Sequence, residues 1–158
     1  MTEQTTDVAT LLPSWSGFHH IALVTRDLDA TMRFYREVLG MQVTFIGPAG
    51  ELHGRHCAIR PGGDPNRLGL LFLSILRLPY SVQKIERSKP LFLIQEQPFS
   101  HISFALPDEA AGLALQERLT HHNVVMSPIM DQGGIWNMAF LDNNGLPLEA
   151  AWPKQATS

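Results

Sequence analysis

The sequence predicts an α+β protein made of two tandem βαβββ modules, and a repeat within the chain is the main reason. Residues 20–39 and 101–120 both begin with His-Ile, continue for five or six residues with the composition of a strand, reach an aspartate (Asp27, Asp108) and then become helix-like. The two segments start 81 residues apart (101 − 20), about half of the 158-residue chain. Short apolar segments separated by turn residues follow each of them. These features indicate a duplication, with a polar site between the two copies.

The first half is predicted to contain one helix and four strands. Residues 17–25 alternate in the manner of a strand. Asp27 suits the N-cap of the following helix, and Gly40 suits its C-terminal end. The three remaining strands are expected over residues 42–46, 55–60 and 69–76.

The second half repeats this order. A strand over residues 101–106 leads through Asp108 into a helix that ends near His122. Three strands are expected over residues 124–130, 135–141 and 146–152, and the last two are joined by an Asp-Asn-Asn-Gly turn. Each predicted helix covers one face of its own sheet and leaves the other face open.

The length and the 44% share of apolar residues fit one domain, expected over residues 16–153. The expected segments are, in order, a flexible N-terminal arm (1–15), module one (about 17–76), a linker (about 77–100), module two (about 101–153) and a tail (154–158).

Composition argues against several functional classes. The net charge of −3 comes without a basic stripe, which gives nucleic-acid binding little support. The richest apolar stretch, residues 68–78, is too short for a membrane span, and the N-terminus lacks the features of a signal peptide. Cys57 is the single cysteine, so a reducing compartment fits best. We therefore expect a cytoplasmic protein that binds a small molecule, with no nucleic acid and no membrane as partner.

Strand alternation places the repeated histidines on the open faces of the two sheets. His20 shares its side of the strand with Ala22 and Val24, and His101 shares its side with Ser103. The bulkier residues of both strands point the other way and suit burial under the helices. Small neighbours beside each histidine leave room for a ligand.

The last strand adds a carboxylate. Glu149 faces away from the bulky Leu148, and a carboxylate in an apolar strand is unfavourable unless it is paired or coordinated. Taken singly, a strand histidine is more often structural, and Glu149 would also suit an edge strand. Together, two histidines and one carboxylate match the facial triad that leaves three positions of an octahedral metal open. His19 should point away from His20 and is not expected to be a ligand.

Three runs of sequence resemble the vicinal oxygen chelate superfamily, which includes glyoxalase I, extradiol dioxygenases, fosfomycin-resistance enzymes and bleomycin-binding proteins. They are HHIALVTRDLDATMRFYREVLGM, HISFALPD and FLDNNGLPLEAAW, of which the last is similar to the family's DPDG-x-x-x-E ending. The resemblance covers roughly residues 17–153. It implies a cupped, incomplete barrel around a metal, with His20, His101 and Glu149 at the metal-ligand positions.

The sequence departs from individual branches of that superfamily. Glyoxalase I-type members carry a fourth ligand on the last strand of module one, where this chain has GLLFLSIL without a carboxylate. Fosfomycin-resistance enzymes carry a threonine where this chain has Ala22. Bleomycin-binding members generally lack the metal ligands. The chain therefore resembles the three-ligand, dioxygenase-like members, which favours Fe2+, with Mn2+, Ni2+, Zn2+ or Co2+ as alternatives.

Three functions follow as expectations. The first is a dioxygenase-like enzyme whose substrate chelates a Lewis-acidic metal through vicinal oxygens. The second is a metal-dependent lyase or isomerase of the glyoxalase or epimerase type, and the third is a non-catalytic, resistance-type protein that binds a small ligand. His56 is a candidate general acid or base, although a strand histidine is more often structural. Because single-domain members usually dimerise, a homodimer is expected, with ligands from one chain or from two.

Overall fold

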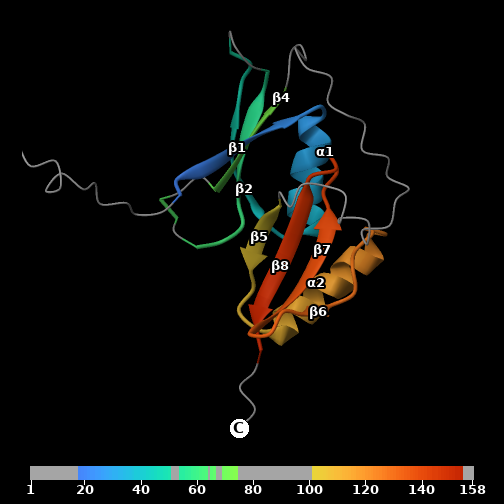
Figure 1. Ribbon diagram of the computed structural model, residues 1–158. Coiled ribbons are helices and arrows are strands. Elements are labelled where there is room, and N and C mark those ends of the chain that lie inside the picture. The colour runs from blue at the N-terminus through green and yellow to red at the C-terminus, as the bar shows by residue number, and fades with distance from the viewer. Residues whose placement is uncertain (1–17, 51–53, 64, 67–68, 75–100, 155–158) are drawn as a thin grey trace, which may run out of the picture.

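The computed structural model has two modules, each with one four-stranded sheet and its own helices (Figure 1). It describes residues 18–50, 54–63, 65–66, 69–74 and 101–154. The predicted N-terminal arm, all of the predicted linker and most of the predicted tail lie outside these ranges. The two sheets remain separate and do not close into a barrel, so the predicted cupped α+β architecture is confirmed.

Module one contains four strands in the spatial order β1-β4-β3-β2. Its elements are β1 (His20–Thr25), α1 (Leu28–Arg33), the π-helical turn η2 (Phe34–Val38), β2 (Gln42–Gly47), β3 (His56–Arg60) and β4 (Gly69–Ser74). Strand β1 runs parallel to β4, while β3 is antiparallel to both β2 and β4. The predicted single helix is thus an α-helix that widens into a π-helical turn.

Module two repeats this topology with the order β5-β8-β7-β6. Its elements are β5 (Ile102–Ala105), α2 (Glu109–His121), β6 (Met130–Asp131), β7 (Ile135–Leu141) and β8 (Pro147–Pro153). Strand β5 is parallel to β8, as β1 is to β4. The duplicated βαβββ pattern is therefore confirmed. No helix within the described ranges is long and apolar enough to cross a bilayer.

The predicted caps start both helices. A side-chain oxygen of Asp27 accepts a hydrogen bond from the Ala30 amide at 2.9 Å, and Asp108 accepts one from Ala111 at 2.8 Å. These bonds satisfy amide groups that have no partner inside the helix. Gly40 follows the first helix with φ +73, a left-handed conformation that glycine adopts without steric strain.

The predicted strand over residues 124–130 is wrong for most of its length. Only Met126 forms a bridge, to Phe140, and β6 is limited to Met130–Asp131. Pro128 lies between them and has no amide hydrogen to give to a ladder. Ser127 bonds Ala139 instead, through its amide at 2.8 Å and its hydroxyl at 2.9 Å.

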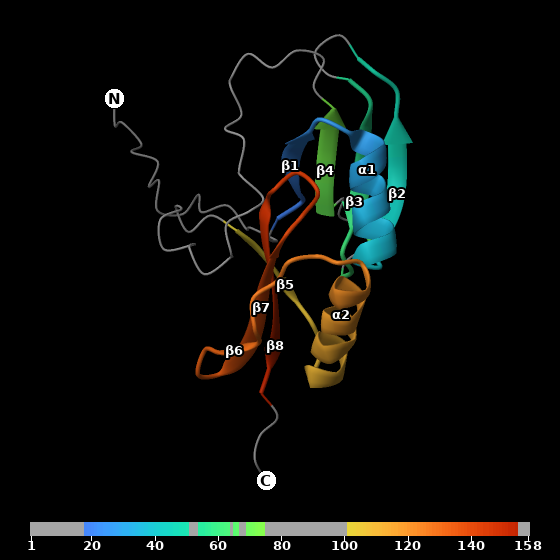
Figure 2. The same cartoon turned by 90° about the vertical axis from the view of Figure 1, so that its right-hand side faces the viewer.

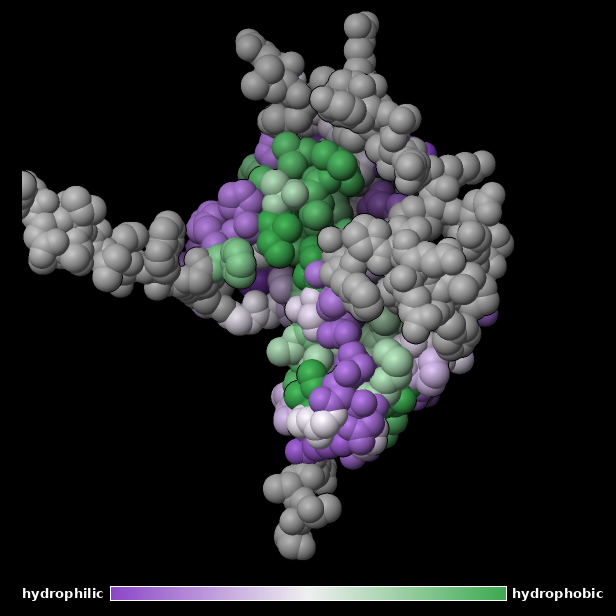
Figure 3. Space-filling view, viewed as in Figure 1, coloured by the Kyte–Doolittle hydropathy of each residue, from purple (hydrophilic) through white to green (hydrophobic). Residues whose placement is uncertain are grey.

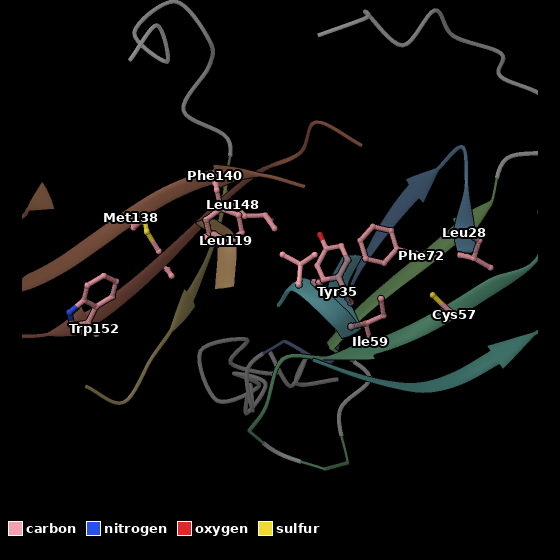
Figure 4. Packing of buried hydrophobic residues seen from close by; sticks show 13 residues of the cluster. Leu28, Tyr35, Cys57, Ile59, Phe72, Leu119, Met138, Phe140, Leu148 and Trp152 are labelled. Atoms are coloured by element: carbon pink, nitrogen blue, oxygen red, sulfur yellow. The ribbon is translucent and has the colours of Figure 1, made fainter. Parts of the chain in front are cut away.

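The buried core runs through both modules, between the helices and the sheets (Figure 4). In module one, Tyr35 and Phe72 are almost fully buried, and their ring centroids are 5.0 Å apart. In module two, Trp152 is 1% exposed and lies so close to Gly112 that a Cβ there would come within 2.6 Å of the indole. Burial of each such side chain is worth about 1.5–3 kcal/mol.

The turn at residues 142–145 docks module two onto module one through a buried polar network. Asp142, 6% exposed, accepts a hydrogen bond from the Tyr35 hydroxyl at 3.1 Å. Thr25 donates to the side-chain oxygen of Asn144 at 2.8 Å, and the Asn144 amide donates to Thr31 at 3.2 Å. Both threonines are almost fully buried. The sequence predicted only that this turn connects two strands, and in the structure it also joins module two to module one.

A second contact joins the helices of the two modules. Figure 2 shows α2 nearly in line with α1 and the η2 turn that continues it, so that the C-terminal ends of η2 and α2 meet. The Arg118 guanidinium donates to the backbone carbonyls of Glu37, at 2.6 Å, and Val38, at 3.0 Å. A cation at the C-terminal end of a helix also interacts favourably with the helix dipole.

Tyr35→Phe is predicted to lower the free energy of unfolding by about 1–3 kcal/mol, because buried Asp142 loses a donor. Burial and the Asp142 carboxylate raise the pKa of Tyr35 above its ordinary value of 10.0. Above that pH the unfolded chain releases this proton while the folded protein keeps it, so wild-type stability falls as pH rises. Tyr35→Phe has no hydroxyl to titrate, so its stability lacks this pH dependence. In urea unfolding, the difference in unfolding free energy between wild type and variant should therefore shrink as the pH rises. A difference in unfolding free energy that stays constant above about pH 10 would contradict the buried Tyr35–Asp142 hydrogen bond.

Candidate metal centre

His20 lies on the open face of its sheet, as predicted. Its backbone pairs with Gly69 of β4, and the following residues of β1 on the same side are Ala22 and Val24. All three side chains of this face are exposed, whereas Thr25 at the end of the strand is buried. His20 therefore stands at one end of an accessible surface.

The second module brings together the other two predicted ligands. His101 directly precedes β5, and Glu149 lies on the neighbouring strand β8, where its backbone pairs with Ser103. The distance from His101 Nε2 to Glu149 Oε1 is 3.9 Å. The side chain of Glu149 is 18% exposed and that of His101 is 39% exposed. The pair forms a solvent-accessible half-site.

Two donors from flanking strands hold the Glu149 carboxylate. The Ser103 hydroxyl of β5 donates to Oε1 at 2.7 Å, and the Asn137 amide of β7 donates to Oε2 at 2.6 Å. Sequence reasoning missed Asn137. Alternation along β7 contained the signal, because Asn137 and Ala139 share one face and Ala139 pairs with Glu149.

A cavity of about 220 Å³ between the modules is lined by His20 together with Ser103. His19 and Arg60 also line it, and its walls carry no carboxylate within the described ranges. The cavity thus joins the open end of β1 to the serine that holds Glu149.

His19 does not point away from His20 as predicted. The two Nδ1 atoms are 2.8 Å apart and the rings meet edge to face. His19 precedes the first residue of β1, so strand alternation does not determine its direction. Because Nδ1 of His20 is engaged with His19, Nε2 is its candidate ligand atom.

The three predicted ligands do not meet within one chain. Among the residues that the structure describes, no three His, Cys, Asp or Glu side chains are close enough to hold a metal ion. The donor types nevertheless fit a divalent transition metal, since imidazole nitrogen and carboxylate oxygen are its usual ligands. Such a metal would need His20 to be added to the His101–Glu149 half-site.

The open face of β4 offers no fourth ligand. Gly69, Leu71 and Leu73 lie on this face, opposite His20, Ala22 and Val24. Cys57 on β3 is buried, and burial raises the pKa of its thiol to about 11, which keeps it protonated at neutral pH.

His56 shares the open face but lies far along it from His20. It pairs with Leu73, and Leu73 pairs with Val24. Val24 is four residues from His20, about 13 Å along a strand. The His56 ring covers Gly47, where a Cβ would come within 2.3 Å of it, and its centroid is 5.4 Å from that of Phe45.

The open side of module one is also apolar. Figure 3 shows hydrophobic surface over its strands. The large exposed side chains there are Val24 at 59% and Phe45 at 49% exposure, and Phe45 pairs with Ala58 on the same side as His56. Large exposed apolar patches are typical of surfaces that bind a ligand or a partner.

Residues 17–150 match the family model of the Glyoxalase/Bleomycin resistance protein/Dioxygenase superfamily. The chain belongs to this superfamily. The match spans both modules and includes all three predicted ligands. No protein of curated function matches the sequence significantly.

Solved structures share the fold at low sequence identity. A glyoxylase/bleomycin resistance protein/dioxygenase domain from Frankia sp. EAN1pec is 23% identical, covers 90% of this chain and 96% of its own, and gives a TM-score of 0.69. TnmS3, an antibiotic binding protein from Streptomyces sp. CB03234, is 16% identical, with coverage of 90% and 100% and a TM-score of 0.63. The fosfomycin resistance protein FosX from Listeria monocytogenes, complexed with Mn(II) and sulfate, is 19% identical, with coverage of 89% and 95% and a TM-score of 0.61.

Gly47→Ala is predicted to destabilise the protein by about 1–3 kcal/mol, because the new methyl group overlaps the His56 ring. The same change should cost much less in a His56→Ala background, where the ring is gone. Unfolding free energies of the four proteins in this double-mutant cycle measure the coupling. Strict additivity would show that the ring does not rest on Gly47 in solution.

Proposed function

We propose that this protein is a divalent-metal-dependent enzyme whose small substrate chelates the metal through two neighbouring oxygens. The observation that carries the proposal is the His101–Glu149 pair, 3.9 Å apart on the open face of module two. Ser103 and Asn137 both donate to Glu149 and hold its carboxylate beside His101. His20 supplies the second imidazole of a two-histidine, one-carboxylate set.

We propose further that a second copy of the chain contributes His20. In a single chain the three donors are not gathered, although His20 and the His101–Glu149 pair both stand on open faces. The exposed apolar side chains Val24 and Phe45 give a second copy a surface to bury. A symmetric dimer would then contain two equivalent sites, each with ligands from both chains.

The preferred chemistry is dioxygenase-like with Fe2+. A bound metal would act as a Lewis acid at the two substrate oxygens. Three protein donors leave three positions of an octahedral ion open, which is the arrangement of non-haem Fe(II) oxygenases. The described part of β4 has no carboxylate to fill one of them. We also propose His56 as a general acid or base for the end of an extended substrate that lies along the open face near Val24, since His56 lies about 13 Å along this face from His20.

One observation favours a second function, a non-catalytic protein that binds an apolar small molecule. The open face of module one exposes Val24 and Phe45, a surface that would suit an aromatic ligand without any metal. TnmS3, which shares the fold, is an antibiotic binding protein. Absence of a metal after reconstitution would favour this function.

The proposal predicts about one divalent ion per chain in protein purified anaerobically without an affinity tag. Glu149→Ala and His101→Ala should each remove the ion, because each takes away one of three donors. Asp131→Ala is a matched control that removes an exposed carboxylate of module two and should retain the metal. Elemental analysis makes the comparison. Iron would support the dioxygenase, and another transition metal would support a lyase or isomerase. Stoichiometric metal in both ligand variants would contradict the site.

A site shared between chains makes a second prediction. His20→Ala and Glu149→Ala homodimers should each lack metal, yet mixing and refolding them together should restore about a quarter of the sites. Half of the randomly formed dimers are mixed, and each mixed dimer has one intact site. If all ligands came from one chain, no metal would return on mixing.

A further inference from the structure

Asn137 has a side-chain environment that packing alone does not explain. It lies in the middle of β7, is 5% exposed, and its amide donates to Glu149 Oε2 at 2.6 Å. Its own oxygen, Oδ1, is buried and has no hydrogen-bond partner among the described residues. A buried acceptor without a donor is unfavourable, and an apolar side chain of the same shape would avoid that penalty.

The register explains how Asn137 reaches Glu149. Ala139 pairs directly with Glu149 and Asn137 pairs with Ala151, so Asn137 is the diagonal neighbour of Glu149 on the open face. On the other side Ser103 pairs directly with Glu149 across β5 and β8. The carboxylate is thus held between two donors on strands that the sheet fixes.

The two donors act on different oxygens. Asn137 bonds Oε2, whereas Ser103 bonds Oε1, the oxygen whose distance to His101 Nε2 is 3.9 Å. A carboxylate oxygen has two lone pairs, so Oε1 can accept from Ser103 and still bind a metal. Holding Oε2 against β7 keeps the carboxylate in one orientation, with Oε1 next to the histidine.

We propose that Asn137 is a positioning residue of the metal centre, which fixes Glu149 as a ligand through Oε1 alone. One bond to the metal from Glu149, in place of two, leaves more of the coordination sphere open to substrate. This inference rests on the proposed metal site. It adds a residue outside the ligand set, and it explains why a polar side chain with an unpartnered oxygen is kept in the middle of β7.

The test is Asn137→Leu, which keeps the branched shape and removes the donor. Mn2+ binding to the metal-free protein, measured by calorimetry, should weaken about 10- to 100-fold, the usual effect of losing a partner that orients a ligand. The melting temperature without metal should stay close to the wild-type value, because loss of the bond to Glu149 is offset by removal of the unpartnered Oδ1. The Co2+ absorption spectrum should also change, since Glu149 is then free to bind through both oxygens.

Ser127→Ala is the matched control. Ser127 is 6% exposed, and its hydroxyl accepts a hydrogen bond from the amide of Ala139, which lies on β7 as Asn137 does. No hydrogen bond to Glu149 is found for Ser127 among the described residues. This variant should lose thermal stability and keep its Mn2+ affinity, which is the opposite pattern to Asn137→Leu.

Failure of the inference and failure of the proposed function are distinguishable. If wild-type protein bound neither Mn2+ nor Co2+, the metal site itself would be wrong. If wild type bound metal and Asn137→Leu bound it equally well, with the same Co2+ spectrum, only the positioning role would be overturned. Asn137→Ala is measured alongside. If both variants were strongly destabilised and neither gave a folded protein with weakened metal affinity, Asn137 would have a structural role. That result would also overturn the inference.

Discussion

The buried contact between the 142–145 turn and module one determines how the two halves of this protein face each other. The contact joins Asp142 to Tyr35, and Asn144 to Thr25 and Thr31. Strand β1, which carries His20, ends at Thr25, and strand β8, which carries Glu149, begins directly after the turn. A single polar network therefore fixes one end of both strands on which the proposed metal site depends. Buried polar groups of this kind hold one arrangement because any other leaves them without partners.

Glu149, like the 142–145 turn, is held in one arrangement by hydrogen bonds to its polar atoms. An ionised side chain in a half-buried strand position is stable only with donors or a cation beside it. Ser103 and Asn137 are the donors, and His101 is the nearby group that would share a cation. Both oxygens of the Glu149 carboxylate accept hydrogen bonds, but the described residues of one chain bring no third metal ligand to this pair. The proposed site therefore takes its third protein ligand from another chain.

Much of the fold could be predicted because local chemistry determines it. Asp27 and Asp108 cap their helices in both modules, and strand alternation placed Glu149 on the open face. What the sequence did not reveal depends on contacts across the fold. Pro128 interrupts the strand expected over residues 124–130 because it has no amide hydrogen to donate. The sequence suggested a continuous strand because apolar residues lie on both sides of the proline. Asn137 donates to Glu149, twelve positions away, and the alternation of β7 indicates the face that Asn137 occupies but not this partner. The docking role of the 142–145 turn is hidden for the same reason.

An anomalous difference map of crystals grown with Co2+ would show whether two chains share one metal site. We predict one strong peak per chain, about 2.0–2.2 Å from His101 Nε2 and from a Glu149 oxygen, with His20 of a second copy as the third protein ligand. Ordered metal at another position, or at this position without His20, would contradict the assignment of a site shared between two open faces.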